Sequence, residues 1–208
     1  MTAKIKLNAA SGGGSFSLQA PSSSSNNRVI TLPDLADGTL LTSSSSIGTR
    51  KVTYGSWVAT SSGTEIAFTS IAATTEFAID FFNVKSAANQ DLKTEIGDSG
   101  GYETSGYQTA TGYAGASGNH NDPSASRWKT EGGADAAALR NGRMHLINLY
   151  GNYWHMVFDY TDTGSSPHFR FYRGTKELSG QLDRIKFDWD GGGAFDGGYM
   201  RYVKFEDV

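Results

Sequence analysis

Residues 153–160 read YWHMVFDY, with a large apolar side chain at every second position. Successive side chains of a β-strand point to opposite faces, so a period of two gathers the apolar side chains on one face. These side chains are Trp154, Met156, Phe158 and Tyr160. The pattern predicts a strand that buries this face in a protein core.

Similar segments recur on both sides of this strand, separated by turns rich in Gly, Ser, Asn and Asp. Many short strands with closely spaced turns are typical of an all-β sandwich. A long polar loop at about residues 114–140 interrupts the series. We expect residues 49–208 to form a jelly-roll β-sandwich domain. Its expected strands are Val52–Val58, Glu65–Phe68, Phe77–Phe82, Leu92–Ile96, Tyr102–Tyr113, Met144–Tyr150, Tyr153–Tyr160, Phe169–Arg173, Leu182–Trp189 and Tyr199–Phe205.

Residues 1–48 have a different composition. They contain two serine runs and neither Tyr nor Trp, although the whole chain has 10 Tyr and 4 Trp. Their strand-like pieces carry too few large apolar side chains to offset the entropy lost in ordering the segment. These pieces therefore either stay mobile or pair with another chain, and pairing predicts an extended, intertwined oligomerisation segment. The pieces are Lys4–Leu7, Ser15–Gln19, Arg28–Leu32 and Thr39–Thr42.

The overall composition excludes several classes of protein. The chain of 208 residues has no Cys, which excludes disulfide frameworks, thiolate zinc sites and cysteine nucleophiles. A net charge of −3 with 19% charged residues gives no electrostatic basis for binding nucleic acid. We expect no membrane insertion and no signal peptide, because no apolar run approaches the ~20 residues of a membrane span.

Three runs in the N-terminal segment together suggest a family. They read SFSLQAP at residues 15–21, NNRVITLPD at 26–34 and DGTLLT at 37–42. Their order resembles a module of tail-fibre and other virion appendage proteins of marine tailed bacteriophages. The resemblance implies that residues 1–48 form a shaft or attachment segment, usually trimeric, that binds other virion proteins.

The remaining chain resembles the terminal β-sandwich that follows such segments. The resemblance covers most of the chain outside the 114–140 loop and implies a non-enzymatic virion structural protein on the tail or head surface, assembled in the host cytoplasm. The matching runs are IAFTSI at 66–71, FFNV at 81–84, IGDSGGYETSGY at 96–107, LDRI at 182–185, FDGG at 195–198 and YVKFE at 202–206.

The run GDSGG at residues 97–101 copies the nucleophile segment of chymotrypsin-like serine proteases. Those enzymes place a histidine base and a buried aspartate before the serine. Here all four histidines follow Ser99. We therefore interpret the run as a tight turn in which Asp98 and Ser99 bond to local backbone.

Several acidic residues suggest other chemistry. Asp188–Asp196 superficially looks like a calcium loop, but it lacks the acid spacing and the later glutamate of an EF-hand. Asp159, Asp162 and the acids of 183–190 could supply a glycosidase carboxylate pair. His145 and His155 lie on neighbouring expected strands and could ligate a metal. For each set the simpler interpretation is structural, and we expect neither a metal nor a cofactor.

Aromatic and polar residues in and around the long loop are better candidates for binding. Rings can cover the apolar C–H surface of a sugar while amides and acids bond its hydroxyls, and Tyr and Trp also anchor protein interfaces. Long loops of compact domains are more often functional than short ones. The candidates for binding a glycan or a partner are Tyr102, Tyr107, Tyr113, Asn119, His120, Asp122, Arg127 and Trp128. The alternative is that these residues only fold the loop back onto the sandwich.

The sequence thus predicts a homotrimeric tail-fibre or spike component that attaches to a host-surface glycan. Several weak sites in one trimer would strengthen attachment through avidity. One alternative is a head decoration or head-fibre protein on the capsid. A second alternative is a small polysaccharide-cleaving tailspike domain.

Overall fold

The computed structural model describes residues 4–8, 11–13, 15–19, 50–71, 75–114, 119–122, 126–130, 136–163 and 168–207. Within these ranges the regular elements are β-strands, and every strand pair is antiparallel. The expected all-β fold is confirmed. No helix in this part of the chain is long and apolar enough to cross a membrane.

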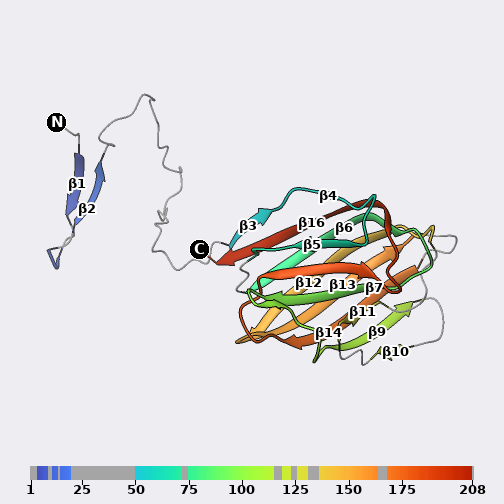
Figure 1. Ribbon diagram of the computed structural model, residues 1–208. Coiled ribbons are helices and arrows are strands. Elements are labelled where there is room, and N and C mark those ends of the chain that lie inside the picture. Colours follow the sequence, from blue (N-terminus) through green and yellow to red (C-terminus); the bar gives the residue numbers. More distant parts are fainter. Residues whose placement is uncertain are drawn as a thin grey trace. The chain divides into compact units, whose positions relative to one another are not determined.

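The chain divides into two compact units, Met1–Ile47 and Gly48–Val208. In the first unit, β1 (Lys4–Asn8) and β2 (Ser15–Gln19) form a two-stranded hairpin (Figure 1). Its turn includes Gly12 and Gly13, both at positive φ. The other two strands expected here, Arg28–Leu32 and Thr39–Thr42, lie outside the described residues.

The second unit is built from two sheets. The larger sheet has nine strands in the order β10-β9-β14-β13-β12-β6-β16-β3, with β4 also paired to β16. Its strands are β3 (Arg50–Tyr54), β4 (Val58–Ala59), β6 (Glu76–Ser86), β9 (Gln108–Ala114), β10 (Asn119–Asp122), β12 (Arg140–Tyr150), β13 (Tyr153–Asp162), β14 (His168–Glu177) and β16 (Phe195–Asp207).

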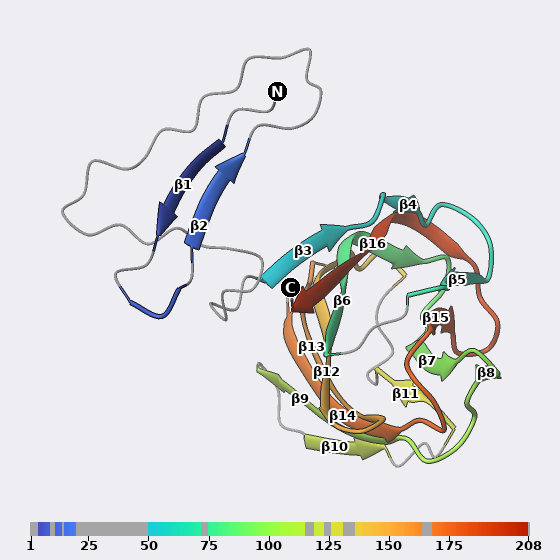
Figure 2. The same cartoon turned by 90° about the vertical axis from the view of Figure 1, so that its left-hand side faces the viewer.

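The smaller sheet has five strands in the order β11-β7-β15-β5, with β8 paired to β7. Its strands are β5 (Glu65–Phe68), β7 (Leu92–Asp98), β8 (Gly101–Tyr102), β11 (Trp128–Lys129) and β15 (Arg184–Trp189). The larger sheet curves around the smaller one, so the core lies between them (Figure 2).

Phe158 on β13 lies at the centre of this core. Its ring centroid is 4.8 Å from those of Phe81 and Tyr160, and the Phe81 ring in turn contacts Phe187 of the smaller sheet at 5.3 Å. All four apolar side chains of the YWHMVFDY strand are at most 2% exposed. The buried face predicted from the period of two is therefore confirmed.

The long loop expected at about 114–140 contains two short strands. β10 pairs with β9, and β11 pairs with β7 so that Trp128 lies opposite Thr94. The single strand expected at Tyr102–Tyr113 is instead divided between β8 and β9, which belong to different sheets. Residues 103–107 connect the two sheets. The Gly- and Ser-rich sequence of this region gave no sign that the chain changes sheet there.

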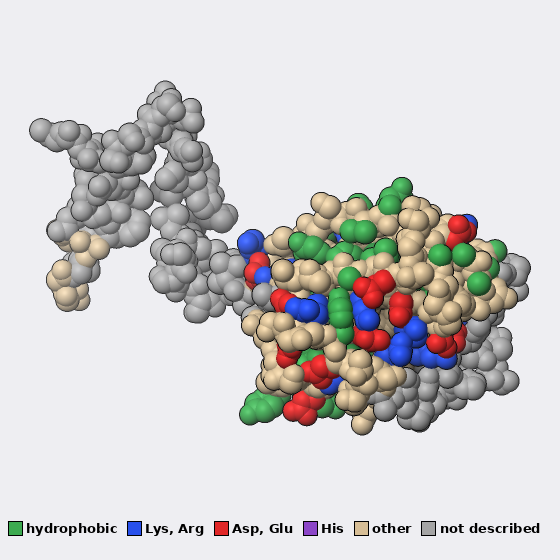
Figure 3. Space-filling model, in the orientation of Figure 1, with side chains coloured by type: hydrophobic (Ala, Val, Ile, Leu, Met, Phe, Trp, Pro, Cys, Tyr) green, Lys and Arg blue, Asp and Glu red, His purple; other side chains and the backbone are tan. Residues whose placement is uncertain are grey.

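The face of the smaller sheet that points away from the core carries paired charges. Lys186 bonds to Glu95 at 3.3 Å and to Glu65 at 3.5 Å, and Lys93 lies 3.4 Å from Asp188. Acidic and basic side chains are accordingly intermixed over this side of the molecule in Figure 3. These pairs contain two lysines and three acids, so they offer no excess of positive charge to a ligand.

Phe158→Ala should destabilise the protein by about 3–5 kcal/mol, because it leaves a cavity among the rings of Phe81, Tyr160 and Tyr172. Val157→Ala is the matched control, since Val157 is on the opposite face of β13 and only half-buried. Urea unfolding should show less than half the loss for the control. Equal losses would contradict the assignment of the two faces.

Candidate functional site

The outer face of the larger sheet, turned away from the core, carries a row of side chains of which four are charged. Strand register places one residue from each of five neighbouring strands in line across this face. We call this row the arginine ladder, and along β14, β13, β12, β6 and β16 it consists of Phe171, Asp159, Arg143, Asp80 and Arg201, with Arg173 joined to Asp159.

A β-bulge in β6 shapes the outer face beside the ladder. Gly142 and Arg140 on β12 lie opposite Phe81 and Val84, so β6 has one residue more than β12 in this interval. Asn83 takes a positive φ of 54°, and its N–H donates to the side-chain oxygen of Asn141 at 2.9 Å. Bulges re-aim side chains and are frequent near functional sites.

Phe82 follows the inward-facing Phe81 and is exposed on the outer face beside the bulge. Phe82, Trp57 and Tyr199 line a cleft of about 370 Å³, and their exposed fractions are 52%, 46% and 46%. The rings of Trp57 and Phe82 are 6.4 Å apart and tilted. We call these three residues the aromatic cleft. Large rings so exposed side by side mark binding surfaces more often than isolated apolar residues do.

Arg201 connects the aromatic cleft with the arginine ladder. Its guanidinium carbon lies 4.5 Å from the centroid of the Trp57 ring and 4.6 Å from that of Tyr54. A guanidinium over aromatic faces is held by cation–π attraction. The Nε of Arg201 also donates to Asp80 at 2.9 Å, so its position is fixed from two directions.

Asp80 is the shared acceptor of the ladder. Arg143 Nε donates to Asp80 Oδ1 at 2.5 Å, and Arg201 Nε donates to Asp80 Oδ2. Burial by itself would raise the pKa of Asp80, but the hydrogen bonds from Arg143 and Arg201 outweigh it and hold the pKa below its usual value. Asp80 is therefore ionised at neutral pH and aligns both arginines.

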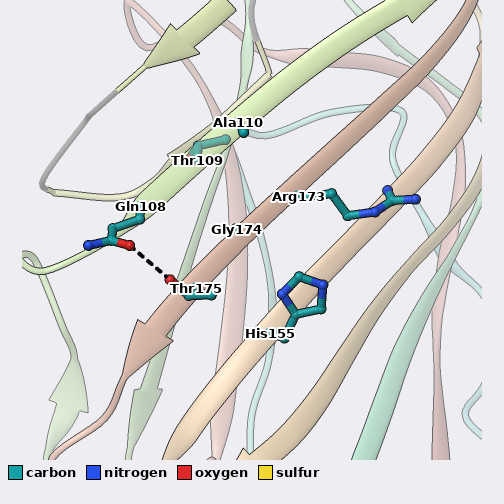
Figure 4. A pocket seen from close by; sticks show the side chains of 7 residues that line it. All are labelled: Gln108, Thr109, Ala110, His155, Arg173, Gly174 and Thr175. Carbon is teal, nitrogen blue, oxygen red and sulfur yellow. Dashed lines mark hydrogen bonds between the residues drawn. The ribbon is translucent and has the colours of Figure 1, made fainter.

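A hollow of about 510 Å³ lies on the same outer face, over β9, β14 and β13. In Figure 4, the side chains of Gln108 and Thr175 point toward each other, and their oxygens are 3.3 Å apart. The ring of His155 lies beside Thr175, and Arg173 extends away from both. We call this the outer hollow; it combines hydrogen-bonding groups with the small residues Ala110 and Gly174.

Two candidates named from the sequence, Tyr107 and Trp128, belong to the core. They are 2% and 1% exposed, and their rings pack edge to face at 5.2 Å. Trp128 Nε1 donates to the carbonyl of Thr175 at 3.3 Å, and a side chain at Gly174 would overlap the indole. The Tyr107 hydroxyl accepts from the N–H of Ile96 at 2.8 Å. Neither ring can face a ligand, which removes both from the candidate binding residues.

Tyr102 and Arg127 lie on the smaller sheet and contact charged neighbours. Tyr102 is half-buried, with Lys186 Nζ 4.8 Å from its ring centroid. Arg127 lies 3.4 Å from Glu95. Both side chains thus join the paired charges of this face rather than the outer face of the larger sheet.

The other four candidates are on the β9–β10 strand pair at one edge of the larger sheet. Tyr113 is on β9, and the remaining three are on β10. In the backbone register, Asn119, His120 and Asp122 lie opposite Gly112, Thr111 and Thr109. The structure therefore brings these four together but separates them from Tyr102, Tyr107, Arg127 and Trp128.

The GDSGG run forms the tight turn between β7 and β8. Asp98 accepts from the Ser179 hydroxyl at 2.8 Å and from the N–H of Gly100 at 2.7 Å, and these bonds lower the pKa of Asp98. A side chain at Gly97 would collide with the carbonyl of Gly101. A hollow of about 430 Å³ adjoins the turn, and its described lining contains no histidine to act as a base for Ser99.

The acids considered for glycosidase or calcium chemistry are dispersed. Asp159 is on the outer face beside Arg173, whereas Asp162 is 4% exposed on the inner face beside Arg170. The others have basic partners: Asp190 lies 2.9 Å from Lys129 and Asp196 lies 2.8 Å from Lys85, while Asp183 pairs with Arg184 and Asp188 with Lys93. Among the residues that the structure describes, no three His, Asp or Glu side chains gather as metal ligands.

The two strand histidines lie diagonally on the outer face. His145 is opposite Val157 and His155 is opposite Ile147. His145 Nδ1 is 3.2 Å from Glu76, and burial lowers the pKa of this histidine more than Glu76 raises it. Each ring thus has its own surroundings, Glu76 for His145 and the outer hollow for His155.

Sequence reasoning missed the aromatic cleft, because it placed Trp57, Phe82 and Tyr199 on three separate strands and did not assign their rings to a face. One signal was available. Phe81 and Phe82 are consecutive, and neighbours on a strand point to opposite faces, so one ring had to face outward. The bulge and the approach of Trp57 and Tyr199 depend on pairing between distant strands and leave no local signal.

No protein-family model, curated protein or solved structure matches the chain in three comparisons. The function is therefore inferred from the residues and their arrangement.

The lowered pKa of Asp80 makes stability depend on pH in a defined direction. Ionised Asp80 stabilises the folded chain above the unfolded pKa of about 3.9, and this contribution is lost as the pH falls through the lower folded value. Asp80→Asn should remove this contribution. As the pH falls from about 4 to 2, the free energy of unfolding should therefore decrease less in the variant than in the parent. Urea unfolding at several pH values measures the slopes, and identical slopes would contradict the shared ion pairs.

Proposed function

We propose that the protein is a bacteriophage virion structural protein, a tail-fibre or spike component that attaches to a glycan on the host surface. The resemblance of residues 15–42 to virion appendage modules suggests the setting. The observation that carries the binding role is the aromatic cleft, where three large rings are exposed together.

An exposed ring can cover the apolar C–H face of a sugar without losing hydrogen bonds, because both surfaces are weakly hydrated. The polar groups that would bond the sugar hydroxyls are adjacent, since Arg201 packs against Trp57 and contacts Asp80. Few, well-placed polar groups beside apolar surface are the usual composition of a small-molecule site. A sugar-binding role suits this arrangement.

The sheet connections are compatible with a jelly roll. The chain passes from β5 in the smaller sheet to β6 in the larger sheet, returns to β7, and later passes from β14 to β15 and back to β16. A chain that crosses repeatedly between two antiparallel sheets is typical of double Greek-key sandwiches.

The N-terminal hairpin supports the proposed oligomer. An isolated two-stranded hairpin such as β1–β2 is at best marginally stable in water. Pairing with equivalent strands of other subunits would supply the missing contacts. We therefore propose residues 1–48 as the trimerisation and virion-docking segment.

The cleavage alternative receives less support from the geometry. A glycosidase needs two carboxyl groups facing one bond, but Asp159 and Asp162 are on opposite faces of β13. The head-decoration alternative shares the trimer and the virion setting. It differs in location, so antibody labelling of virions distinguishes tail from head.

Trp57→Ala should weaken glycan binding by at least about fivefold, because truncating a central aromatic anchor commonly costs more than about 1 kcal/mol. Binding of the full chain to a glycan array, followed by titration of the best glycan, measures the loss. Tyr150→Ala is the matched control, since Tyr150 is 87% exposed outside the cleft. Unchanged binding by Trp57→Ala would refute the cleft as the site.

Deletion of residues 1–47 should convert a trimer into monomers and abolish incorporation into virions. Light scattering measures the mass of the full and shortened chains, and immunoblotting of purified virions measures incorporation. The urea midpoint of the shortened chain should remain close to that of the parent, because the core of Gly48–Val208 is separate. A shortened chain that is still trimeric would contradict the assigned role of this segment.

A further inference from the structure

We propose that the glycan is an acidic polysaccharide, and that its anionic groups bind between Arg143 and Arg201 at the centre of the arginine ladder. This inference rests on the proposed function and specifies its ligand class. The shared chemistry is a planar or tetrahedral oxyanion, carried by a uronate carboxylate or a sulfate ester.

The geometry of the arginine pair carries the proposal. Both arginines bond to Asp80 through Nε, one to each carboxylate oxygen. The terminal nitrogens of each guanidinium are thereby left to donate to a ligand. Two adjacent forks fixed by one anion suit a carboxylate or sulfate, which guanidinium groups bind through paired hydrogen bonds.

The exposed fractions of Asp80, Arg143 and Arg201 agree with an acid that positions the arginines and arginines that contact the ligand. The Asp80 side chain is 12% exposed, whereas the side chains of Arg143 and Arg201 are 40% and 26% exposed. The anion that holds the pair is thus recessed, and the cations are accessible. Asp80 acts as a positioning residue, and the arginines make the proposed contacts.

The charge balance of the ladder favours an anionic ligand. The ladder contains Arg143, Arg173 and Arg201 against Asp80 and Asp159, which leaves one positive charge in excess. The smaller sheet differs, because its three paired lysines face four acids, Asp188, Asp190, Glu65 and Glu95. A local excess of positive charge on a chain with net charge −3 directs an anion to this face.

The ladder also joins the two concave parts of the outer face. The aromatic cleft adjoins Arg201 at one end, and Arg173 lines the outer hollow at the other. Four strand spacings separate β14 from β16, or roughly 19 Å at about 4.8 Å per strand. This length suits an extended chain with repeated acidic units better than a single small anion.

The test measures binding of the full-length protein to three polysaccharides at low and at physiological salt. Alginate supplies carboxylates, dextran sulfate supplies sulfates and dextran is neutral. We expect at least one acidic polymer to bind at least about tenfold more tightly than dextran, and to weaken as salt rises. The acidic polymer that binds more tightly identifies the source of the oxyanion.

Arg143→Gln should weaken binding of that acidic polymer by about tenfold, the loss expected for a charge-assisted hydrogen bond. Arg184→Gln is the matched control, because it removes the same charge from the smaller sheet and should change the affinity less than about twofold. Arg143→Lys keeps the charge without the planar fork and should lie between them. Unfolding midpoints confirm that each variant is folded.

Equal binding of the acidic and the neutral polysaccharides would overturn the inference, and so would equal effects of Arg143→Gln and Arg184→Gln. Polyglutamate that binds as tightly as the acidic polysaccharide would also overturn it, because that result would indicate an acidic protein partner. Failure of the proposed function looks different, since no glycan would bind or Trp57→Ala would have no effect. A neutral glycan that needs Trp57 but not Arg143 would refute only this inference.

Discussion

The alternation of side chains across the strands of the larger sheet governs both the core and the outer face. On β13 the side chains of Trp154, Met156, Phe158 and Tyr160 pack inward, which leaves His155 and Asp159 on the other surface. The register of the neighbouring strands places their side chains on the same inner and outer faces. The large inner rings therefore fix the place of the polar side chains, because a shift of one residue would exchange the two faces.

The bulge in β6 is the point where this alternation is interrupted. Phe77, Ile79 and Phe81 face the core before it, and Val84 and Ser86 are buried after it. The inward positions thus change from odd to even numbers, and Phe82 and Asn83 remain outside. Phe82 keeps the outward position that regular alternation after Phe81 gives it. The bulge keeps Asn83 outside as well and returns Val84 to the core.

The sequence was sufficient to predict features set by local periodicity. The strand at 153–160 and its buried face needed only a period of two, which the ordering of large side chains displays directly. For Tyr107 and Trp128 the sequence left two interpretations open, binding and packing of the loop onto the sandwich, because polar neighbours surround both in the chain. Contacts with Ile96 and Thr175, on other strands, decide for packing.

The candidate site was even less accessible from the sequence. Trp57, Phe82 and Tyr199 come from three distant segments, and Asp80 reads as an isolated acid within an apolar run. The ladder becomes visible only when the register of five strands is known. Such pairing is non-local, so neither composition nor spacing predicts it.

The position of β3 has a mechanical consequence. This strand directly follows the N-terminal unit and pairs antiparallel with β16 from Arg50 to Tyr54, and Trp57 comes three residues later. A pulling force between the N-terminal unit and a ligand held at Trp57 would pass through this short segment. The bonds between β3 and β16 would carry part of this force in shear. The packed core between the two sheets would carry none of it.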